Sequence, residues 1–378
     1  MQLEVPGVNG KWFCTGHEIF PAMLLAIEAA QKSVCLETYI FSTGPLGDRF
    51  RDALVAARRR GVSVRVLIDA FGSYSLSSSF WRSLFAVGGE VRRFNPLALN
   101  RLGIRDHRKL LVCDEQVAFV GGFNIAPQYD GDGVTCGWCD LGLMLEGPLA
   151  QRLAESFEEM FQRADFQNKP LVGRRQPRTK RILVGRREKL LLSGPGLGLN
   201  PIKRSLRADL RHARSVQIMV GYFLPTWRLR RQLIRIARAG GRVQLILAGK
   251  SDVWISQLAA RSLYRRLLKA GVEIYEYQPQ VLHAKLFIVD DVVYAGSANL
   301  DQRSLNLNYE IMLRLEERAL VDQAREVFEN TRRHCAQVTR GAWRKSRNVW
   351  SRFKQQTAYW LLVRLDPYLA RRQWRGLL

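Results

Sequence analysis

The chain has 378 residues, of which 47% are hydrophobic and 25% charged, so it holds enough apolar side chains to bury sizeable cores. This length predicts two domains, and six cysteines in so long a chain exclude a small disulfide-based scaffold. Lys and Arg outnumber Asp and Glu by 59 to 34, which gives a net charge of +25. A surface this basic attracts polyanions, namely nucleic acids or anionic lipid bilayers.

The N-terminal stretch, MQLEVPGVNGKWFCTGHEIF, lacks a basic start followed by an apolar core, so we expect no cleavable signal peptide. No run reaches the roughly 18 uncharged apolar residues of a membrane span. We therefore expect a cytosolic protein, or one that lies against a membrane without crossing it.

An internal repeat organises the chain. In the first half, LLAIEAAQKSVCLETYIF is followed by FRDALVAARRRGVSVRVLIDAFGS, FWRSLFAVGGEVRRFNP and DHRKLLVCDEQVAFVGGFN. In the second half, LRADLRHARSVQIMVGYF is followed by LRRQLIRIARAGGRVQLILAGKSD, LYRRLLKAGVEIYEYQP and LHAKLFIVDDVVYAGSAN. Each copy predicts helix, buried strand, helix, buried strand, helix and strand, because amphipathic spacing alternates with short β-branched runs. The fold class is therefore α/β, with an α/β layer sandwich built twice.

The repeat and the charge distribution divide the chain into four segments. We expect a first domain over residues 1–168, a basic linker over 169–189, a second domain over 190–340 and a basic, aromatic, amphipathic tail over 341–378. The linker holds nine Lys/Arg and one Glu and the tail nine Lys/Arg and one Asp, so these two segments carry +16 of the net +25. Pro and Gly breaks in the linker indicate an exposed connector.

Each half contains the same polar motif among apolar residues. The first motif is His107-x-Lys109-x4-Asp114, followed after six residues by Gly121-Gly122-x-Asn124. The second is His283-x-Lys285-x4-Asp290, followed after five residues by Gly296-Ser297-x-Asn299. Alternation along a strand puts the His and Lys of a motif on one face, and a hairpin turn returns the Asn toward the His. Two copies packed about a pseudo-twofold axis would bring both sets to one shared site.

This combination of side chains suits phosphodiester chemistry. One neutral imidazole attacks phosphorus while the other, protonated, donates to the leaving alkoxide, and the two then exchange roles for the second displacement. Charge developing on the phosphate oxygens would be held by the side chains of Lys109, Lys285, Asn124, Asn299 and Ser297. The lysines supply positive charge, so this chemistry calls for no metal and no other cofactor. Cys136 and Cys139 form a C-x-x-C, but no second pair or His cluster completes a zinc set.

An imidazole in this role needs a carboxylate to orient its other ring nitrogen. Asp140 and Glu310 occupy equivalent positions after the two motifs, and we assign Asp140 to His107 and Glu310 to His283. Asp114 and Asp290 belong to the catalytic motifs, but we expect them to fix the hairpins through turn and backbone hydrogen bonds.

These residues resemble the two H-x-K-x4-D motifs of the phospholipase D superfamily, and the similarity covers essentially the whole chain. ETYIF, ARRRGVSVRVLIDAFGS, VRRFNP and NLDQRSLNLNYE further resemble bacterial cardiolipin synthases, especially the short type without N-terminal membrane spans. The resemblance implies two tandem phospholipase D-like α/β/α sandwich domains with a shared active site at their interface. It also implies transfer of a phosphatidyl group from one phosphatidylglycerol to another through a phosphohistidine intermediate, with release of glycerol. By analogy, His107 is the nucleophile and His283 the acid, an order that the duplication itself leaves open.

The sequence departs from the symmetric pattern at two places. Gly122 stands where the second motif has Ser297, so a hydroxyl is available on one side only. The second hairpin is one residue shorter, and a shorter turn would shift Gly296, Ser297 and Asn299 relative to His283.

The tail over residues 341–378 indicates which kind of partner the protein binds. Its Trp and Phe residues alternate with Arg and Lys, a composition typical of an interfacial helix on an anionic bilayer. These interfacial residues are Trp343, Trp350, Phe353, Trp360, Leu361 and Trp374. We therefore expect phosphatidylglycerol and the membrane surface as partners, and a peripheral location on the cytoplasmic face of the inner membrane.

Three other functions fit parts of the same pattern. A nuclease acting on DNA or RNA would use the same catalytic set and the same basic charge, but no nucleic-acid-binding module is recognisable. A phospholipid hydrolase differs only in whether water or an alcohol attacks the intermediate. A non-enzymatic binding protein would not need both His-Lys sets.

Overall fold

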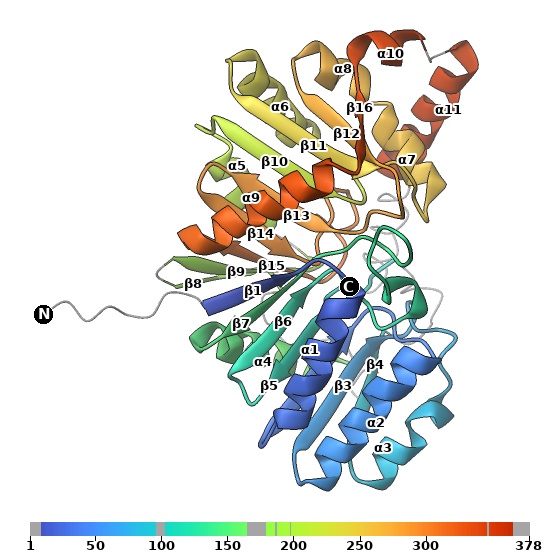
Figure 1. Cartoon of the computed structure of the whole chain (residues 1–378), viewed down its shortest axis with the longest axis vertical. Helices are drawn as coiled ribbons and strands as arrows, with labels where there is room; N and C mark the ends of the chain where they lie inside the picture. Colours follow the sequence, from blue (N-terminus) through green and yellow to red (C-terminus); the bar gives the residue numbers. More distant parts are fainter. Residues whose placement is uncertain are drawn as a thin grey trace, which may run out of the picture.

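The computed structural model describes residues 9–95, 103–164, 179–185, 187–196, 198–345 and 348–365. The described chain forms two mixed sheets that lie one above the other along the long axis of the molecule (Figure 1). The first half of the chain forms one sheet and its helices, and the second half forms the other. The α/β class expected from the sequence is confirmed.

The first sheet has seven strands in the order β1-β7-β6-β5-β2-β3-β4. Its strands are β1 (Asn9–Phe13), β2 (Ser33–Thr38), β3 (Ser63–Asp69), β4 (Glu90–Phe94), β5 (Leu110–Cys113), β6 (Val117–Gly121) and β7 (Gly142–Glu146). Its helices are α1 (Gly16–Ala29), α2 (Pro45–Arg59), α3 (Arg82–Ala86) and α4 (Pro148–Arg163), with short 3-10 turns η1 (Ser78–Trp81) and η2 (Pro127–Tyr129).

The second sheet has nine strands in the order β16-β12-β11-β10-β13-β14-β15-β9-β8. Its strands are β8 (Arg181–Val184), β9 (Glu188–Ser193), β10 (Ser215–Val220), β11 (Arg242–Ala248), β12 (Glu273–Tyr277), β13 (Lys285–Val289), β14 (Val292–Gly296), β15 (Glu310–Leu315) and β16 (Cys335–Val338). Its helices are α5 (Pro201–Asp209), α6 (Trp227–Arg238), α7 (Trp254–Arg261), α8 (Tyr264–Lys269), α9 (Arg318–Arg332), α10 (Arg340–Lys345) and α11 (Val349–Trp360), and a π-helical turn, η3 (Leu361–Leu365), follows.

The two sheets repeat one strand topology. In the first, β2, β3 and β4 are parallel neighbours, and β5 and β6 continue the sheet from β2 as antiparallel strands. In the second, β10, β11 and β12 take the parallel positions and β13 and β14 the antiparallel ones. The internal repeat seen in the sequence is therefore a repeat of the fold.

A single apolar core joins the two halves. It contains residues of α4 and β7 from the first half together with residues of α9, β13 and β15 from the second. Separate cores lie beneath the outer helices of each half. Strand β14 also packs directly against β6 and β7. Because the inner faces of both sheets are buried in one continuous core, the strand ends that carry the two motifs are held close to each other.

Part of the segment expected as a linker belongs to the second sheet instead. Residues 181–184 form β8, which pairs antiparallel with β9, and β9 itself begins at Glu188. Residues 169–178 and 186 of that expected linker lie outside the described residues, as do residues 165–168 before it. Within the part of the chain that the structure describes, no helix is long and apolar enough to cross a membrane.

The shorter second hairpin does not shift the residues that follow it, contrary to the expectation. Leu110, three residues after His107, pairs with Val120, the residue before Gly121. Leu286, three residues after His283, pairs with Ala295, the residue before Gly296. The missing residue is lost from the turn alone, so both motifs enter the interface in the same register.

The motif aspartates fix these hairpins to the neighbouring strand. Asp114 has a left-handed backbone, with φ at 55°, and its carboxylate accepts from the backbone N–H groups of residues 31–33 at 2.7–2.8 Å. Asp290, with φ at 47°, accepts from the N–H groups of residues 214 and 215 at 3.0 and 2.8 Å. Burial alone would raise the pKa of Asp114, but these backbone donors outweigh it and lower the pKa. This geometry agrees with the hairpin role expected from the sequence.

We expect Asp114→Ala to lower the free energy of unfolding by about 2 kcal/mol, because it leaves backbone donors without an acceptor. Turnover per folded molecule should stay near that of the parent protein. Urea denaturation followed by circular dichroism measures the first quantity. Glu115→Ala, at the next turn residue with φ at 59°, is the matched control and should change stability much less. A large loss of turnover in stable, folded Asp114→Ala would assign this carboxylate to the chemistry instead.

Candidate active site

Two short backbone pairings bring the motifs of the two halves together. The N–H of His107 donates to the carbonyl of Tyr309 at 3.0 Å, and the N–H of Tyr309 donates to the carbonyl of Arg105 at 2.8 Å. The second motif repeats this pairing, with the N–H of His283 donating to the carbonyl of Cys139 at 2.7 Å. Each motif therefore hydrogen-bonds to the strand-entry segment of the other half, as the pseudo-twofold arrangement requires.

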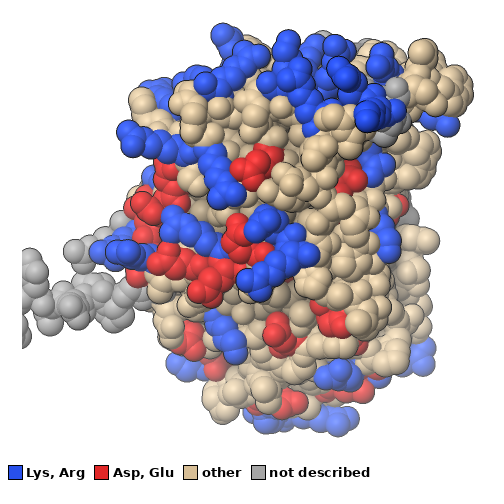
Figure 2. All heavy atoms as spheres, turned by 45° about the horizontal axis from the view of Figure 1, so that its top comes forward, with Lys and Arg blue, Asp and Glu red and all other residues tan. Residues whose placement is uncertain are grey.

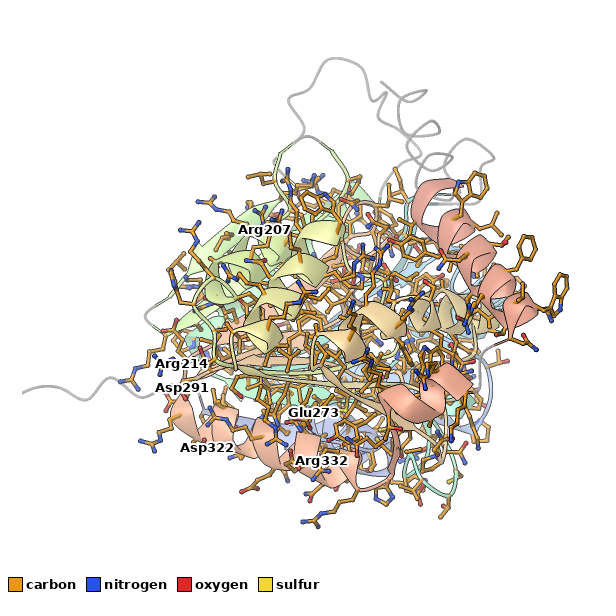
Figure 3. All side chains as sticks on the ribbon, turned by 90° about the horizontal axis from the view of Figure 1, so that it is seen from above. Arg207, Arg214, Glu273, Asp291, Asp322 and Arg332 are labelled. Carbon is orange, nitrogen blue, oxygen red and sulfur yellow. The ribbon has the colours of Figure 1, made fainter. Side chains whose placement is uncertain are left out.

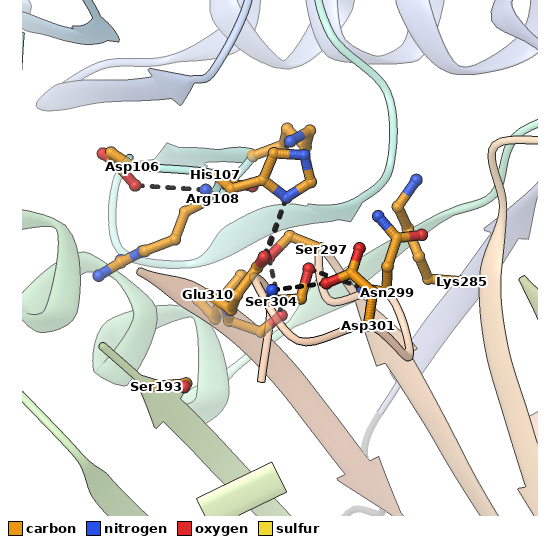
Figure 4. Close-up of polar contacts among 12 residues, drawn as sticks. Asp106, His107, Arg108, Ser193, Lys285, Ser297, Asn299, Asp301, Ser304 and Glu310 are labelled. Atoms are coloured by element: carbon orange, nitrogen blue, oxygen red, sulfur yellow. Dashed lines mark hydrogen bonds and ion pairs between the residues drawn. The ribbon is translucent and has the colours of Figure 1, made fainter. Parts of the chain in front are cut away.

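These pairings place each orienting carboxylate on the histidine of the other half. Nδ1 of His107 lies 3.1 Å from the carboxylate of Glu310, as Figure 4 shows, and Nδ1 of His283 lies 2.6 Å from Oδ2 of Asp140. The assignment of Asp140 to His107 and Glu310 to His283 was therefore wrong, although the four residues were the right ones. The reason is the backbone, since Glu310 and Asp140 directly follow the residues that pair across the interface.

Both motif lysines are buried and fold back on their own motifs. Nζ of Lys109 donates to the carbonyl of His107 at 2.7 Å and lies 5.3 Å from the ring centroid of Tyr39. Nζ of Lys285 donates to the carbonyl of His283 and lies 2.8 Å from its Nδ1. Burial lowers the pKa of Lys109 to about 7 and that of Lys285 to about 8, against the attraction of the nearby carboxylates.

Burial favours the neutral form of both imidazoles. Burial lowers the pKa of His107 to about 4, because desolvation outweighs the attraction of Glu310 and Lys109 adds repulsion. Burial lowers the pKa of His283 as well, and repulsion from Lys285 lowers it further, whereas the attraction of Asp140 raises it. Burial would raise the pKa of Asp140, yet Lys285 and His283 outweigh it and keep this carboxyl ionised. A carboxylate at Nδ1 holds the ring proton there, so Nε2 keeps its lone pair.

The equivalent positions 122 and 297 hold different residues because position 122 lies against Asp140 and position 297 against Glu310. A Cβ at position 122 would lie 2.0 Å from Oδ1 of Asp140, so only glycine leaves room for that carboxylate. In the second half the hydroxyl of Ser297 donates to Oε2 of Glu310 and accepts from the N–H of Ile311 at 3.1 Å. The Ser297 hydroxyl is thus engaged in holding Glu310, whereas the sequence suggested a phosphate contact for it.

The two asparagines also differ. Asn124 is buried, its Nδ2 donates to the hydroxyl of Tyr129 at 2.7 Å, and its Oδ1 accepts from the N–H of Ile40 at 3.0 Å. Its amide is therefore committed to the fold of the first half. Asn299 is buried as well, but its Oδ1 has no hydrogen-bond partner among the described residues. A phosphate-binding role for both remains a prediction, and only Asn299 has an unpaired amide atom.

Aromatic rings surround both imidazoles, and the sequence reasoning missed them. The ring of Tyr39 lies 5.1 Å from that of His107. Tyr129 and Trp138 lie 5.2 and 5.6 Å from the ring of His283. Tyr129 is held by Asn124, so the first motif supports the second histidine through this ring. The position of Tyr39 at the end of a buried strand, in ETYIF, was the available signal.

A buried charged cluster beside His107 has no counterpart in the second half. Arg108 lies 3.1 Å from Glu37, and its N–H donates to Asp106 at 3.2 Å. Burial raises the pKa of both Glu37 and Asp106, against the attraction of Arg108. The positions equivalent to Glu37, Asp106 and Arg108 are the apolar residues Met219, Leu282 and Ala284. A buried ion pair is weak support for stability, so its presence in one half alone marks the two half-sites as chemically different.

The cysteines are all free, and no group of three His, Cys, Asp or Glu residues in the described chain is arranged to hold a metal ion. Cys136 is exposed, while Cys139 lies at the interface beside Asp140. Burial raises the pKa of the Cys139 thiol, which keeps it protonated. In the structure, Cys139 packs against the shared core and pairs through its backbone with Leu282.

The fold and site define the class. Two α/β repeats that contribute one His-Lys set each to a common interface are the architecture of the phospholipase D superfamily. A solved structure with the same fold is the phosphatidylserine synthase of Haemophilus influenzae Rd KW20, with a TM-score of 0.74, 15% identity, and coverage of 96% of this chain and 94% of that one.

Sequence comparison narrows the class to one family. The family model described as cardiolipin synthase, PLD-like domain, matches residues 23–162 and 206–332. Cardiolipin synthase 1 of Bacillus anthracis is 32% identical over 348 residues, which cover 89% of this chain and 68% of the relative. Cardiolipin synthase B of Salmonella typhimurium is 32% identical over 369 residues, covering 92% and 86%. The chain belongs to the cardiolipin synthase family of phospholipase D-like proteins, which confirms the resemblance seen in the sequence.

The crossed pairing predicts which histidine responds to which carboxylate. Asp140→Asn should change the ring-nitrogen NMR shifts of His283 and leave those of His107 nearly unchanged, because the Asp140 carboxylate contacts the His283 ring and not the His107 ring. Glu310→Gln is the matched control and should do the opposite. Asp140→Asn and Glu310→Gln should each lower the rate of the catalysed reaction by roughly 10²- to 10⁴-fold, the usual contribution of a positioned acid or base. The crossed arrangement would be contradicted if Asp140→Asn changed the shifts of His107 and Glu310→Gln those of His283.

Proposed function

We propose that this protein synthesises cardiolipin by transferring a phosphatidyl group from one phosphatidylglycerol to the hydroxyl of another, with release of glycerol. The observation that carries the proposal is the pair of neutral, carboxylate-oriented imidazoles that two halves of a cardiolipin synthase family member bring to one interface. Two buried lysines beside these rings supply the positive charge that a phosphodiester needs.

The first displacement forms an enzyme intermediate. Nε2 of His107 forms a bond to phosphorus while the bond from phosphorus to the glycerol oxygen breaks, and protonated His283 gives its proton to that oxygen. Burial favours the neutral form of His283 in the free site, so this ring takes up a proton from solvent when the anionic substrate binds. A bound phosphodiester offsets the repulsion between Lys109 and Lys285 and raises the pKa of His283. The product is a phosphatidyl group on His107 and free glycerol.

The second displacement reverses these roles. The hydroxyl of a second phosphatidylglycerol gives its proton to His283 while its oxygen bonds to phosphorus, and the bond from phosphorus to Nε2 of His107 breaks. Glu310 holds the His107 ring and Asp140 the His283 ring throughout both steps. Lys109 and Lys285 face the charge that develops on the phosphate oxygens.

The unequal exposure of the two rings supports His107 as the nucleophile. The His107 side chain is 12% exposed and that of His283 5% exposed. The more accessible ring is the one that a bulky lipid phosphorus reaches. Nζ of Lys285 also lies 2.8 Å from Nδ1 of His283, and a cation at this distance lowers the nucleophilicity of the His283 ring.

We propose that the protein works peripherally on the cytoplasmic face of the inner membrane, with anionic phospholipid rather than nucleic acid as its partner. Helix α11 supports this, because Val349, Trp350, Phe353 and Trp360 are exposed by 81, 62, 60 and 55%. Such a face beside basic residues is typical of interfacial helices. Residues 366–378, including Trp374, lie outside the described residues.

The first experiment is to incubate the protein with phosphatidylglycerol vesicles in excess EDTA and to follow the products by mass spectrometry. We expect cardiolipin and one glycerol for each cardiolipin. His107→Ala and His283→Ala should each lower the rate on the order of 10⁴-fold or more, because the two residues act as a unit. His212→Ala removes a histidine outside the site and is the matched control. Phosphatidic acid without cardiolipin would make the protein a hydrolase, and cleavage of plasmid DNA with untouched lipid would make it a nuclease.

The pKa values predict a bell-shaped dependence of kcat/KM on pH. Activity should fall below about pH 4 as His107 gains a proton and loses its lone pair, and on the alkaline side as His283, whose pKa is lowered by burial, loses the proton that it must donate. Above about pH 7 the loss of charge on Lys109 makes this alkaline fall steeper. Lys109→Arg keeps the charge at high pH, so it should remove the part of the alkaline fall that begins near pH 7, whatever its effect on the maximum rate. Profiles measured on short-chain phosphatidylglycerol test this, and an unchanged alkaline limb in the variant would contradict it.

A further inference from the structure

A cavity lined by arginines lies in the second half, on elements other than those that form the active site. Its volume is about 310 Å³, and α6, α8 and α11 form its walls. Arg230 comes from α6, Arg265 and Arg266 from α8, and Arg352 from α11. The remaining lining residues are Ser262, Leu263, Gln356 and Tyr359. The volume lies within the range of small-molecule sites.

The charge of this cavity is uncompensated in the protein. No Asp or Glu is among its lining residues, and none of the four arginines forms an ion pair with an acidic residue in the described chain. Among the side chains that the structure describes, Tyr359 alone hydrogen-bonds to one of these guanidinium groups, its hydroxyl accepting from Arg230 at 3.3 Å. Figure 2 shows that Lys and Arg gather at this end of the molecule, over α6, α8 and α10. Four like charges around one space repel each other, and an anion bound among them removes that cost.

The faces of α11 place the cavity beside the exposed aromatic surface. Arg352, Gln356 and Tyr359 are spaced four and three residues apart, so they share the helix face that lines the cavity. Trp350 and Phe353, three residues apart, stack on an adjacent face with ring centroids 5.7 Å apart. The buried side of α11 packs on α7, whose first residue, Trp254, is itself 68% exposed. Figure 3 shows α11 at the edge of the molecule with its side chains pointing outward.

We propose that this cavity binds the phosphate group of an anionic phospholipid and so fixes the second half on the bilayer while the active site works on another lipid. Guanidinium groups match phosphate because their donors form a planar fork that contacts two oxygens at once. The aromatic face of α11 enters the interface at the level of the headgroups, which is where such a phosphate is found. The ligand chemistry is therefore a phosphate diester next to an apolar boundary. This proposal stands on the cavity and not on the reaction proposed above.

The test compares two double variants that remove the same charge. Arg266→Gln with Arg352→Gln removes a cation from each of two walls of the cavity. Arg207→Gln with Arg214→Gln is the control, because these exposed residues form no ion pair in the described chain and lie across the molecule from α11 in Figure 3. Binding is measured by cosedimentation with vesicles of phosphatidylglycerol and phosphatidylcholine, and with phosphatidylcholine alone.

We expect the cavity variant to bind the anionic vesicles roughly 30-fold more weakly and the control within about twofold of the parent, on the usual contribution of cations at an anionic surface. Turnover of monomeric short-chain phosphatidylglycerol should be unchanged in both, which separates this site from the active site and from misfolding. An equal loss in the two variants, or no loss in the cavity variant, would overturn the proposal.

Two further arms identify the source of the phosphate. Inorganic phosphate that releases the parent protein from vesicles, at an ionic strength where chloride does not, would show that the cavity takes free phosphate and overturn the lipid assignment. A cavity variant that loses binding to single-stranded DNA and keeps binding to vesicles would overturn it in favour of nucleic acid. We expect neither. Inorganic phosphate has no apolar part for the α11 face to contact, and the phosphates of single-stranded DNA have no acyl boundary beside them for that face to enter.

Discussion

The whole site depends on backbone pairing between the two halves of the chain. His107 is held by the carbonyl of Tyr309 and His283 by the carbonyl of Cys139, each from the opposite half. These bonds decide where Glu310 and Asp140 lie, and the carboxylates decide the tautomer of each imidazole. Because one continuous core lies between the sheets, it holds the paired segments, and with them both imidazoles and their carboxylates, in place.

Burial at this interface has a second effect, which is electrostatic. It lowers the pKa of both histidines and both lysines, because water no longer solvates their charged forms. The lysines nevertheless lie beside the two imidazoles, so an anionic substrate bound there would supply the charge that makes their ionised state favourable. The free site would thus favour binding of an anion, and the bound anion would in turn favour the protonated forms of the buried histidines and lysines.

Much of this could be read from the sequence. The repeat, the α/β class and the two His-Lys sets follow from periodicity and spacing, and Asp114 and Asp290 fix the hairpins as their turn positions indicate. The crossing of Asp140 and Glu310 could not be read, because no local pattern tells which side of an interface a residue faces. The expected shift of Ser297 was wrong since a deletion in a turn leaves strand register intact. The strand β8 was missed because its Arg-rich sequence looks like a connector, although it pairs at the sheet edge.

The crossing of the carboxylates has a consequence for how such a protein arises. A single copy of this fold would hold a histidine without a carboxylate at its Nδ1, so it would need a second copy to complete each pair, and pairing would depend on protein concentration. Joining two copies in one chain replaces that limit with a high effective concentration of one half around the other. Once joined, the halves no longer need identical surfaces, and Glu37, Asp106 and Arg108 opposite Met219, Leu282 and Ala284 record how far they have diverged. Covalent linkage therefore allows two equivalent half-sites to become chemically different.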